Sequence, residues 1–343
     1  MLDAKARLAL FMPGALLSDI GKTGVGVLRY SPLDVVAIID PDAAGQDAAR
    51  LLPRVRPCPI VARIEEAHAV GATALVLGTA PPGGRVPDDW WATIDRAVEL
   101  GMSVVNGLHD RLAPRYPHLA KGQTVWDIRI EPADLKPGSG AAAFLPNRRV
   151  LLVGVDMAIG KMTAALELHA AAERRGLRSA FVATGQTGIM IAGRGTPLDA
   201  VRVDYAAGAV EREVMACADA EIVFVEGQGA LNHPGATANL ALMRGSMPTD
   251  LVLCTKAGMR ELQKTPGYPL PPLSELLRLY EDLTSACGTF PRARARAAAV
   301  DTRGLDEDAA AKAIRAIEAE AHVPADDPVR NGADRLLSAI LEA

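Results

Sequence analysis

Aromatic residues are scarce in this 343-residue chain, at 4% of the sequence, although apolar residues make up 49%. A core of this composition consists mainly of Ala, Val, Leu and Ile side chains. Such cores are typical of parallel sheets whose two faces are both covered by helices. The length is sufficient for two domains of ordinary size. The composition therefore predicts an α/β protein with two domains.

Closely spaced cysteines and long basic runs are also missing. The four cysteines form no C-x-x-C pair, which argues against a zinc knuckle or a disulfide framework, and we predict no metal site. The net charge is −4, and the arginines between Pro291 and Arg296 alternate with small residues, as on the exposed rim of a strand. Nucleic acid is therefore not expected as a partner.

No apolar run approaches the roughly 18 residues that a membrane-spanning helix needs. The N-terminus is not expected to be a signal peptide, because Asp3 precedes its basic residues and Pro13-Gly14 interrupts its apolar stretch. We therefore expect a cytoplasmic protein without a membrane partner.

The most informative stretch is V-L-L-V-G-V-D-M-A-I-G-K-M-T, residues 150–163. An apolar run predicts a buried strand, a loop bounded by glycines follows, and Lys161 begins a helical pattern. Strand, glycine loop, lysine and helix in this order indicate a phosphate-binding loop, in which backbone N–H groups and the helix N-terminus face one anion. The residues predicted to bind the phosphate compound are Gly154, Asp156, Met157, Ala158, Ile159, Gly160, Lys161, Met162 and Thr163. We expect the Lys161 side chain to be exposed.

Two features of this loop depart from the common G-x-x-x-x-G-K-[ST] pattern. The spacing around Asp156 resembles that of dethiobiotin synthetase, where an acidic residue enters the loop. Met162 stands where a Ser or Thr hydroxyl usually holds Mg²⁺, and a thioether is a poor ligand for a hard cation. The sequence therefore predicts a loop that holds phosphate without a nucleotide-bound Mg²⁺.

Strand-like and helix-like segments alternate through both halves of the chain, which predicts two parallel sheets. We expect a Rossmann-like N-terminal domain over residues 1–134, a Gly- and Pro-rich linker over 135–147, and a P-loop NTPase-like domain over 148–343. The glycine-rich segment Gly21–Gly26 shows no helical pattern and is expected to be a loop.

Polar residues in the second half gather where predicted strands end, which is where ligands bind in open parallel sheets. Gln186 and Thr187 lie between two glycines, and Glu226, Gln228 and His233 follow another strand. Glu226 is predicted either to be a catalytic group or to cap a turn. His233, in a loop, is either a general base or a structural histidine.

Several motifs together resemble one family. They are G-V-D-M-A-I-G-K-M-T, A-T-G-Q-T-G-I-M-I-A-G, V-E-G-Q-G-A-L-N-H-P and L-V-L-C in the second half, with K-T-G-V-G-V-L-R-Y-S-P, A-P-P-G-G-R-V-P-D-D-W and N-G-L-H-D in the first. The family is a two-domain one, long labelled as of unknown function, that includes D-glutamate N-acetyltransferase. The resemblance implies a Rossmann-like half followed by a P-loop half, with acetyl-CoA as co-substrate in place of a nucleoside triphosphate.

The function that this resemblance implies is N-acetylation of D-glutamate or a related amino acid, with the phosphate loop gripping coenzyme A. Glu226 or His233 would take the amine proton and Gln228 would align the thioester. Gln186 and Thr187 would contact the substrate, and Arg29 and Arg194 would be partners for its carboxylate, because guanidinium binds carboxylate through two hydrogen bonds.

Two other functions remain open at this point. One is a Mg-ATP-dependent kinase or ligase resembling dethiobiotin synthetase, with Asp156 and Glu226 holding Mg²⁺. The other is a nucleotide-responsive regulatory protein without turnover. A homodimer or higher homo-oligomer is expected, as is common for α/β enzymes.

Overall fold

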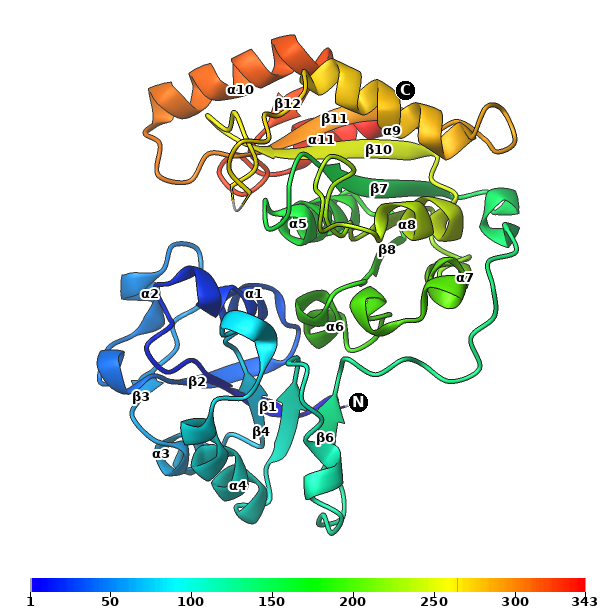
Figure 1. The fold of residues 1–343 in the computed structure, drawn as a ribbon. Helices are drawn as coiled ribbons and strands as arrows, with labels where there is room; N and C mark the ends of the chain where they lie inside the picture. Colours follow the sequence, from blue (N-terminus) through cyan, green and yellow to red (C-terminus); the bar gives the residue numbers. More distant parts are fainter. Residues whose placement is uncertain (1, 264, 343) are drawn as a thin grey trace. The chain divides into compact units, whose positions relative to one another are not determined.

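The computed structural model describes residues 2–263 and 265–342 and separates into two compact units (Figure 1). Unit 1 comprises Met1–Ile130 together with Gln186–Pro197, and unit 2 comprises Glu131–Gly185 together with Leu198–Ala343. The chain thus leaves unit 2 after Gly185, contributes one short segment to unit 1, and returns at Leu198. Such an excursion was not foreseen from the sequence.

Unit 1 is built on a six-stranded parallel sheet with the order β3-β2-β1-β4-β5-β6. Its strands are β1 (Arg7–Phe11), β2 (Asp34–Ile39), β3 (Ile60–Val61), β4 (Ala74–Leu77), β5 (Ser103–Asn106) and β6 (Val125–Asp127). Its helices are α1 (Lys22–Tyr30), α2 (Ala48–Leu51), α3 (Ile64–Ala69), α4 (Trp91–Glu99) and α6 (Gln186–Ala192). This strand order is that of Rossmann-type folds, and it confirms the predicted class of the N-terminal half.

The expectation of a loop at Gly21–Gly26 was wrong, because helix α1 begins at Lys22. Gly24 lets this helix approach the sheet: its N–H donates to the Gly78 carbonyl oxygen at 2.7 Å. A Cβ at Gly24 would lie 2.3 Å from the Met12 sulfur. Close packing therefore stabilises a helix in a segment whose glycines have low helix propensity.

Unit 2 is built on a second six-stranded parallel sheet, with the order β12-β11-β10-β7-β9-β8. Its strands are β7 (Arg148–Gly154), β8 (Ser179–Val182), β9 (Ile222–Val225), β10 (Asp250–Lys256), β11 (Arg294–Asp301) and β12 (Ala325–Asp326). Nearly every residue of β7, β9 and β10 is buried. Since successive side chains point to opposite faces, both faces of the central sheet are covered, as its continuous apolar runs predict.

The helices of unit 2 are α5 (Lys161–Arg174), α7 (Val203–Met215), α8 (Asn239–Ser246), α9 (Leu273–Ser285), α10 (Glu307–Ala321) and α11 (Asp334–Leu341). Helix α5 follows β7 directly through the glycine loop and packs against β7, β8 and β9. The predicted P-loop-like class of the second half is confirmed by this topology. No helix in the described ranges has the length and apolarity needed to cross a membrane.

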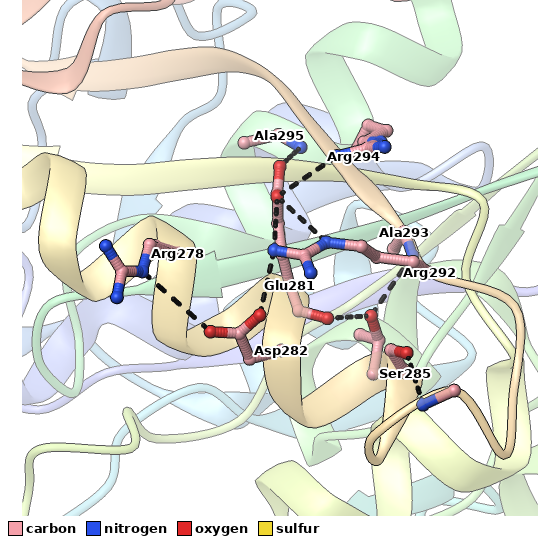
Figure 2. A network of polar contacts seen from close by, with 10 residues as sticks. Arg278, Glu281, Asp282, Ser285, Arg292, Ala293, Arg294 and Ala295 are labelled. Atoms are coloured by element: carbon pink, nitrogen blue, oxygen red, sulfur yellow. Dashed lines mark hydrogen bonds and ion pairs between the residues drawn. The ribbon is translucent and has the colours of Figure 1, made fainter.

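Arg294 begins β11 and Arg292 lies just before it, at the edge of a strand as predicted, and both are paired with acids of helix α9 (Figure 2). Arg296 instead bonds Asp250 of β10. Glu281 accepts the backbone N–H of Ala295 at 2.8 Å and lies 3.3 Å from the Arg292 guanidinium and 3.7 Å from that of Arg294. The backbone bond fixes α9 beside this strand, whereas exposed ion pairs contribute little stability.

Candidate functional site

The phosphate loop joins the C-terminal end of β7 to helix α5. Its backbone turns through positive φ at Ala158 (54°) and Gly160 (93°). Gly160 is the N-cap residue of α5 and supplies no side chain to bond the first N–H groups of the helix. Because these groups also have no acceptor within the helix, they are available to an anion. The loop is tied to the neighbouring strand by the Val155 N–H, which donates to the Cys254 carbonyl oxygen at 3.2 Å.

Lys161 is buried, with 6% of its surface exposed, so the expected exposure of its side chain was wrong. Its Nζ donates to the Asp156 carbonyl oxygen at 2.7 Å. The side chain passes Gly227, where an added Cβ would lie 3.0 Å from its Cδ and 1.7 Å from the Leu152 carbonyl oxygen. Burial lowers the pKa of Lys161 to about 8, although Asp156 and Glu226 favour its charged form. At neutral pH, Lys161 is therefore mostly charged and forms a buried cation next to the phosphate loop.

Glu226 follows the last residue of β9 and is 5% exposed. Its Oε2 accepts the backbone N–H groups of Thr184 at 2.9 Å and Gly185 at 3.2 Å. Burial raises the pKa of the carboxyl from 4.5 to about 7, although these N–H groups, the Lys161 charge and a hydrogen bond from Gln228 stabilise the carboxylate. Glu226 is therefore a carboxyl that changes its protonation near neutral pH.

Gln228 and Thr184 complete the surroundings of this carboxyl. The Gln228 amide Nε2 donates to the Thr184 hydroxyl at 3.1 Å, and that hydroxyl donates to the Glu226 carbonyl oxygen at 2.8 Å. The end of β9 and the segment after β8 are thus connected through side chains. Within unit 2, Gln228 therefore lies beside Glu226, which in turn interacts with the phosphate-loop lysine.

His233 lies in a turn after β9 and is buried, as is Asp156 in the phosphate loop. The His233 Nδ1 accepts the Gly235 N–H at 3.0 Å, so the proton of the neutral ring is on Nε2. That Nε2 lies 3.8 Å from Asp156 Oδ1 and 3.5 Å from the Thr265 hydroxyl. The two Asp156 oxygens also accept backbone N–H groups, of Met157 at 2.6 Å and Gln263 at 2.9 Å.

Two residues that the sequence did not single out hold the same turn against the phosphate loop. The Tyr280 hydroxyl donates to the Gly154 carbonyl oxygen at 2.9 Å and accepts the Leu231 N–H at 3.0 Å. The Asn232 Nδ2 donates to the Val155 carbonyl oxygen at 2.9 Å. Tyr280 had no distinguishing signal, because a buried tyrosine in an amphipathic helix looks like core. Asn232 was signalled only by its position next to His233.

The predicted substrate residues Gln186, Thr187, Arg29 and Arg194 all belong to unit 1. Gln186 begins helix α6, and the Thr187 hydroxyl lies 3.0 Å from that of Thr23 on α1. Arg29 donates to the Pro53 carbonyl oxygen at 3.0 Å. Unit 2 therefore brings together the phosphate loop, Glu226, Gln228 and His233, and the roles of the four residues of unit 1 stay predictions.

The described residues contain no group of three or more His, Cys, Asp or Glu placed to hold a metal ion. A cavity of about 310 Å³ in unit 1 is lined by Lys5, Thr73 and Ser103. It lies at the amino ends of β1, β4 and β5, away from the carboxyl ends at which parallel sheets bind ligands.

Taken together, a Rossmann-like unit and a unit with a glycine loop between β7 and α5 define a two-unit α/β protein with a phosphate-binding loop. Matches to protein-family models identify the family within this class. Residues 136–337 match the model described as a domain of unknown function, the DUF1611 P-loop domain, and residues 41–131 match the Rossmann-like N-terminal domain of the same name. The chain belongs to this family, as its motifs indicated.

Solved and named relatives agree with this assignment. The crystal structure of a DUF1611 family protein from Anabaena variabilis ATCC 29413 is 49% identical, with a TM-score of 0.95, and covers 99% of this chain and 100% of that one. A D-glutamate N-acetyltransferase of Tritonibacter scottomollicae is 35% identical over 287 residues, which are 81% of this chain and 84% of the relative. Another, from Pseudoalteromonas sp., is 31% identical over 278 residues, 80% of this chain and 82% of the relative.

Proposed function

We propose that this protein is an amino-acid N-acetyltransferase that transfers an acetyl group from acetyl-CoA to D-glutamate or a related amino acid. The names of its two relatives support the reaction class. The observation in the structure that carries the proposal is the buried Glu226 carboxyl, with a pKa of about 7, next to the phosphate-loop lysine. A base that titrates near the operating pH suits the removal of a proton from an ammonium group.

The proposed reaction forms one bond and breaks one. The ammonium of the amino acid loses a proton to the Glu226 carboxylate, and the free amine nitrogen attacks the thioester carbonyl carbon. The N–C bond forms and the C–S bond breaks, and coenzyme A leaves as a thiolate. This thiolate takes up the second proton, which the nitrogen loses as the amide forms, and Glu226 releases the first to solvent. The side-chain amide of Gln228, which lies within the hydrogen-bond network of Glu226, aligns the thioester oxygen.

The phosphate loop suits coenzyme A, because the phosphates of coenzyme A need a cation and N–H donors but no catalytic metal. Lys161 supplies the charge, and the uncapped first turn of α5 supplies the donors. Met162 offers no oxygen where the Mg²⁺-holding hydroxyl of an NTPase would stand.

The described contacts favour Glu226 over His233 as the base. His233 Nδ1 already accepts the Gly235 N–H, so a proton taken up at this nitrogen would break that hydrogen bond. We therefore assign His233 and Asp156 to holding the turn after β9 against the phosphate loop. Glu226 becomes the proton acceptor.

The test is an assay of the purified protein with D-glutamate and acetyl-CoA. We expect release of free thiol together with a product heavier than the substrate by one acetyl group. Lys161→Ala should lose this activity, and Lys312→Ala, which removes an exposed lysine of α10, is the matched control and should keep it. Failure to acetylate any amino acid, with turnover of Mg-ATP instead, would replace this proposal by the kinase or ligase hypothesis. A cytoplasmic location and a homo-oligomeric state stay predictions.

A further inference from the structure

Two unpaired polar atoms lie close together in the chain, on the segment that follows Glu226. Among the described residues, three buried side-chain atoms lack a hydrogen-bond partner: Arg29 Nε in unit 1, and Asn232 Oδ1 and Asn239 Nδ2 in unit 2. A buried polar atom without a partner is destabilising. Two of them lie within eight residues of one segment, which makes this segment a candidate for contact with a bound group.

The orientation of the Asn232 amide is fixed by its other end. Its Nδ2 donates to the Val155 carbonyl oxygen in the phosphate loop, so the unpaired atom is the oxygen and it needs a donor. The adjacent Leu231 N–H is held by Tyr280, whose hydroxyl also bonds Gly154. A Cβ added at Gly154 would lie 3.1 Å from the Lys161 Nζ, so the lysine side chain runs close to this end of the loop. Asn232 therefore borders the phosphate loop, whose lysine interacts with Glu226.

Asn239 presents the opposite chemistry. It is the first residue of α8 and is only 6% exposed, and its unpaired atom is the Nδ2 donor. This nitrogen lies 3.7 Å from the position of a Cβ added at Gly229, so it faces the backbone of the segment that leaves Glu226. A group that accepts hydrogen bonds would pair with it.

The zwitterion of an amino acid is a donor at one end and an acceptor at the other. We propose that Asn232 and Asn239 bind the backbone of the acceptor amino acid, Asn232 Oδ1 accepting from its ammonium and Asn239 Nδ2 donating to its α-carboxylate. This inference rests on the proposed function and assigns its acceptor site. Both asparagines lie on the segment that follows the proposed proton acceptor Glu226.

The test is calorimetric binding of D-glutamate in the absence of acetyl-CoA, compared with its α-carboxamide and with its side-chain carboxamide. Asn239→Asp replaces the donor by an acceptor of the same shape. We expect this variant to bind D-glutamate at least about tenfold more weakly, relative to the α-carboxamide, than the parent does, a change of about 1.4 kcal/mol in binding free energy. The α-carboxamide is less affected because it can donate a hydrogen bond to the new carboxylate. The ratio of the two carboxamides should shift in the same sense, because only the α-carboxamide changes the group that Asn239 contacts.

Asn147→Asp is the matched control, because Asn147 is also 6% exposed and in unit 2 but bonds Cys217 and Arg149 at the start of β7. It should leave every binding ratio unchanged. For Asn232, replacement by Ala should weaken the binding of D-glutamate at least about tenfold in the same titration without acetyl-CoA. Thermal melts show that each variant is folded.

Unchanged ratios in Asn239→Asp, with unchanged D-glutamate affinity in Asn232→Ala, would overturn the inference and assign the two atoms to internal water. Absence of amino-acid binding to the parent protein would overturn it as well. The turnover assay with acetyl-CoA separately decides the proposed function. If the parent acetylates D-glutamate while both asparagine variants bind it normally, only the assignment of the acceptor site fails.

Discussion

Replacement of Glu226 by Gln tests the proposed base directly. With a pKa of about 7, the carboxyl is about half ionised at pH 7 and only about one tenth ionised at pH 6. In the parent protein at saturating acetyl-CoA, kcat/KM for the amino acid should therefore rise about tenfold per pH unit below pH 6 and level off above pH 8. E226Q should lower kcat/KM by about 10²–10⁴-fold and abolish this dependence, because the amide cannot accept the proton.

The same carboxyl predicts the opposite effect on stability. The unfolded chain ionises near pH 4.5, whereas the folded chain keeps its proton up to about pH 7. Between these values the folded state binds more protons, so stability falls as pH rises through this window, by an amount on the order of 3 kcal/mol. A glutamine keeps an acceptor for the Thr184 N–H without the charge. E226Q should therefore raise the melting temperature at pH 8 and not at pH 4.5.

The assay is the release of coenzyme A thiol between pH 5 and 9, with thermal melts at the two ends of the range. H233A is the comparison, and it should cost less than tenfold in kcat/KM at pH 7, because Nδ1 is occupied by the Gly235 N–H. If E226Q keeps activity within tenfold and the parent pH profile, Glu226 is not the base. A large loss in H233A alone would transfer the role to the histidine.

Four further outcomes are expected. K161A should lose tight binding of acetyl-CoA with the fold intact, and unchanged affinity would contradict a phosphate role for Lys161. In the parent, the KM for acetyl-CoA should rise above about pH 8, because Lys161 loses its charge there. Turnover should survive EDTA, because Met162 cannot hold Mg²⁺, and loss restored by Mg²⁺ would favour the ATP hypothesis. Y280F should lower the free energy of unfolding by about 1–3 kcal/mol in denaturant titrations, since the Leu231 N–H and the Gly154 carbonyl lose their shared partner; an unchanged value would show that this bridge contributes nothing.

The elements that the sequence predicted best are those with the strongest local patterns. The apolar run of β7, the glycines and the lysine predicted strand, loop and helix in the correct order. Glu226 could be placed at a strand end because β9 is continuously apolar. Helix α1 could not be predicted, because its glycines act through contact with Met12 and Gly78, which are distant or unmarked in the sequence.

The sequence by itself determined the class of each half and the identity of the phosphate loop, because apolar periodicity and a glycine-lysine pattern are local properties of the chain. Only the tertiary structure decided that Lys161 is buried, that Glu226 titrates near pH 7, and that Asn232 and Tyr280 hold the neighbouring turn. These properties depend on desolvation and on hydrogen bonds between residues 41 to 126 positions apart. Local sequence patterns do not show which distant residues become neighbours in the folded chain. Burial in the folded state raises the Glu226 pKa to the range in which the carboxyl can act as a base.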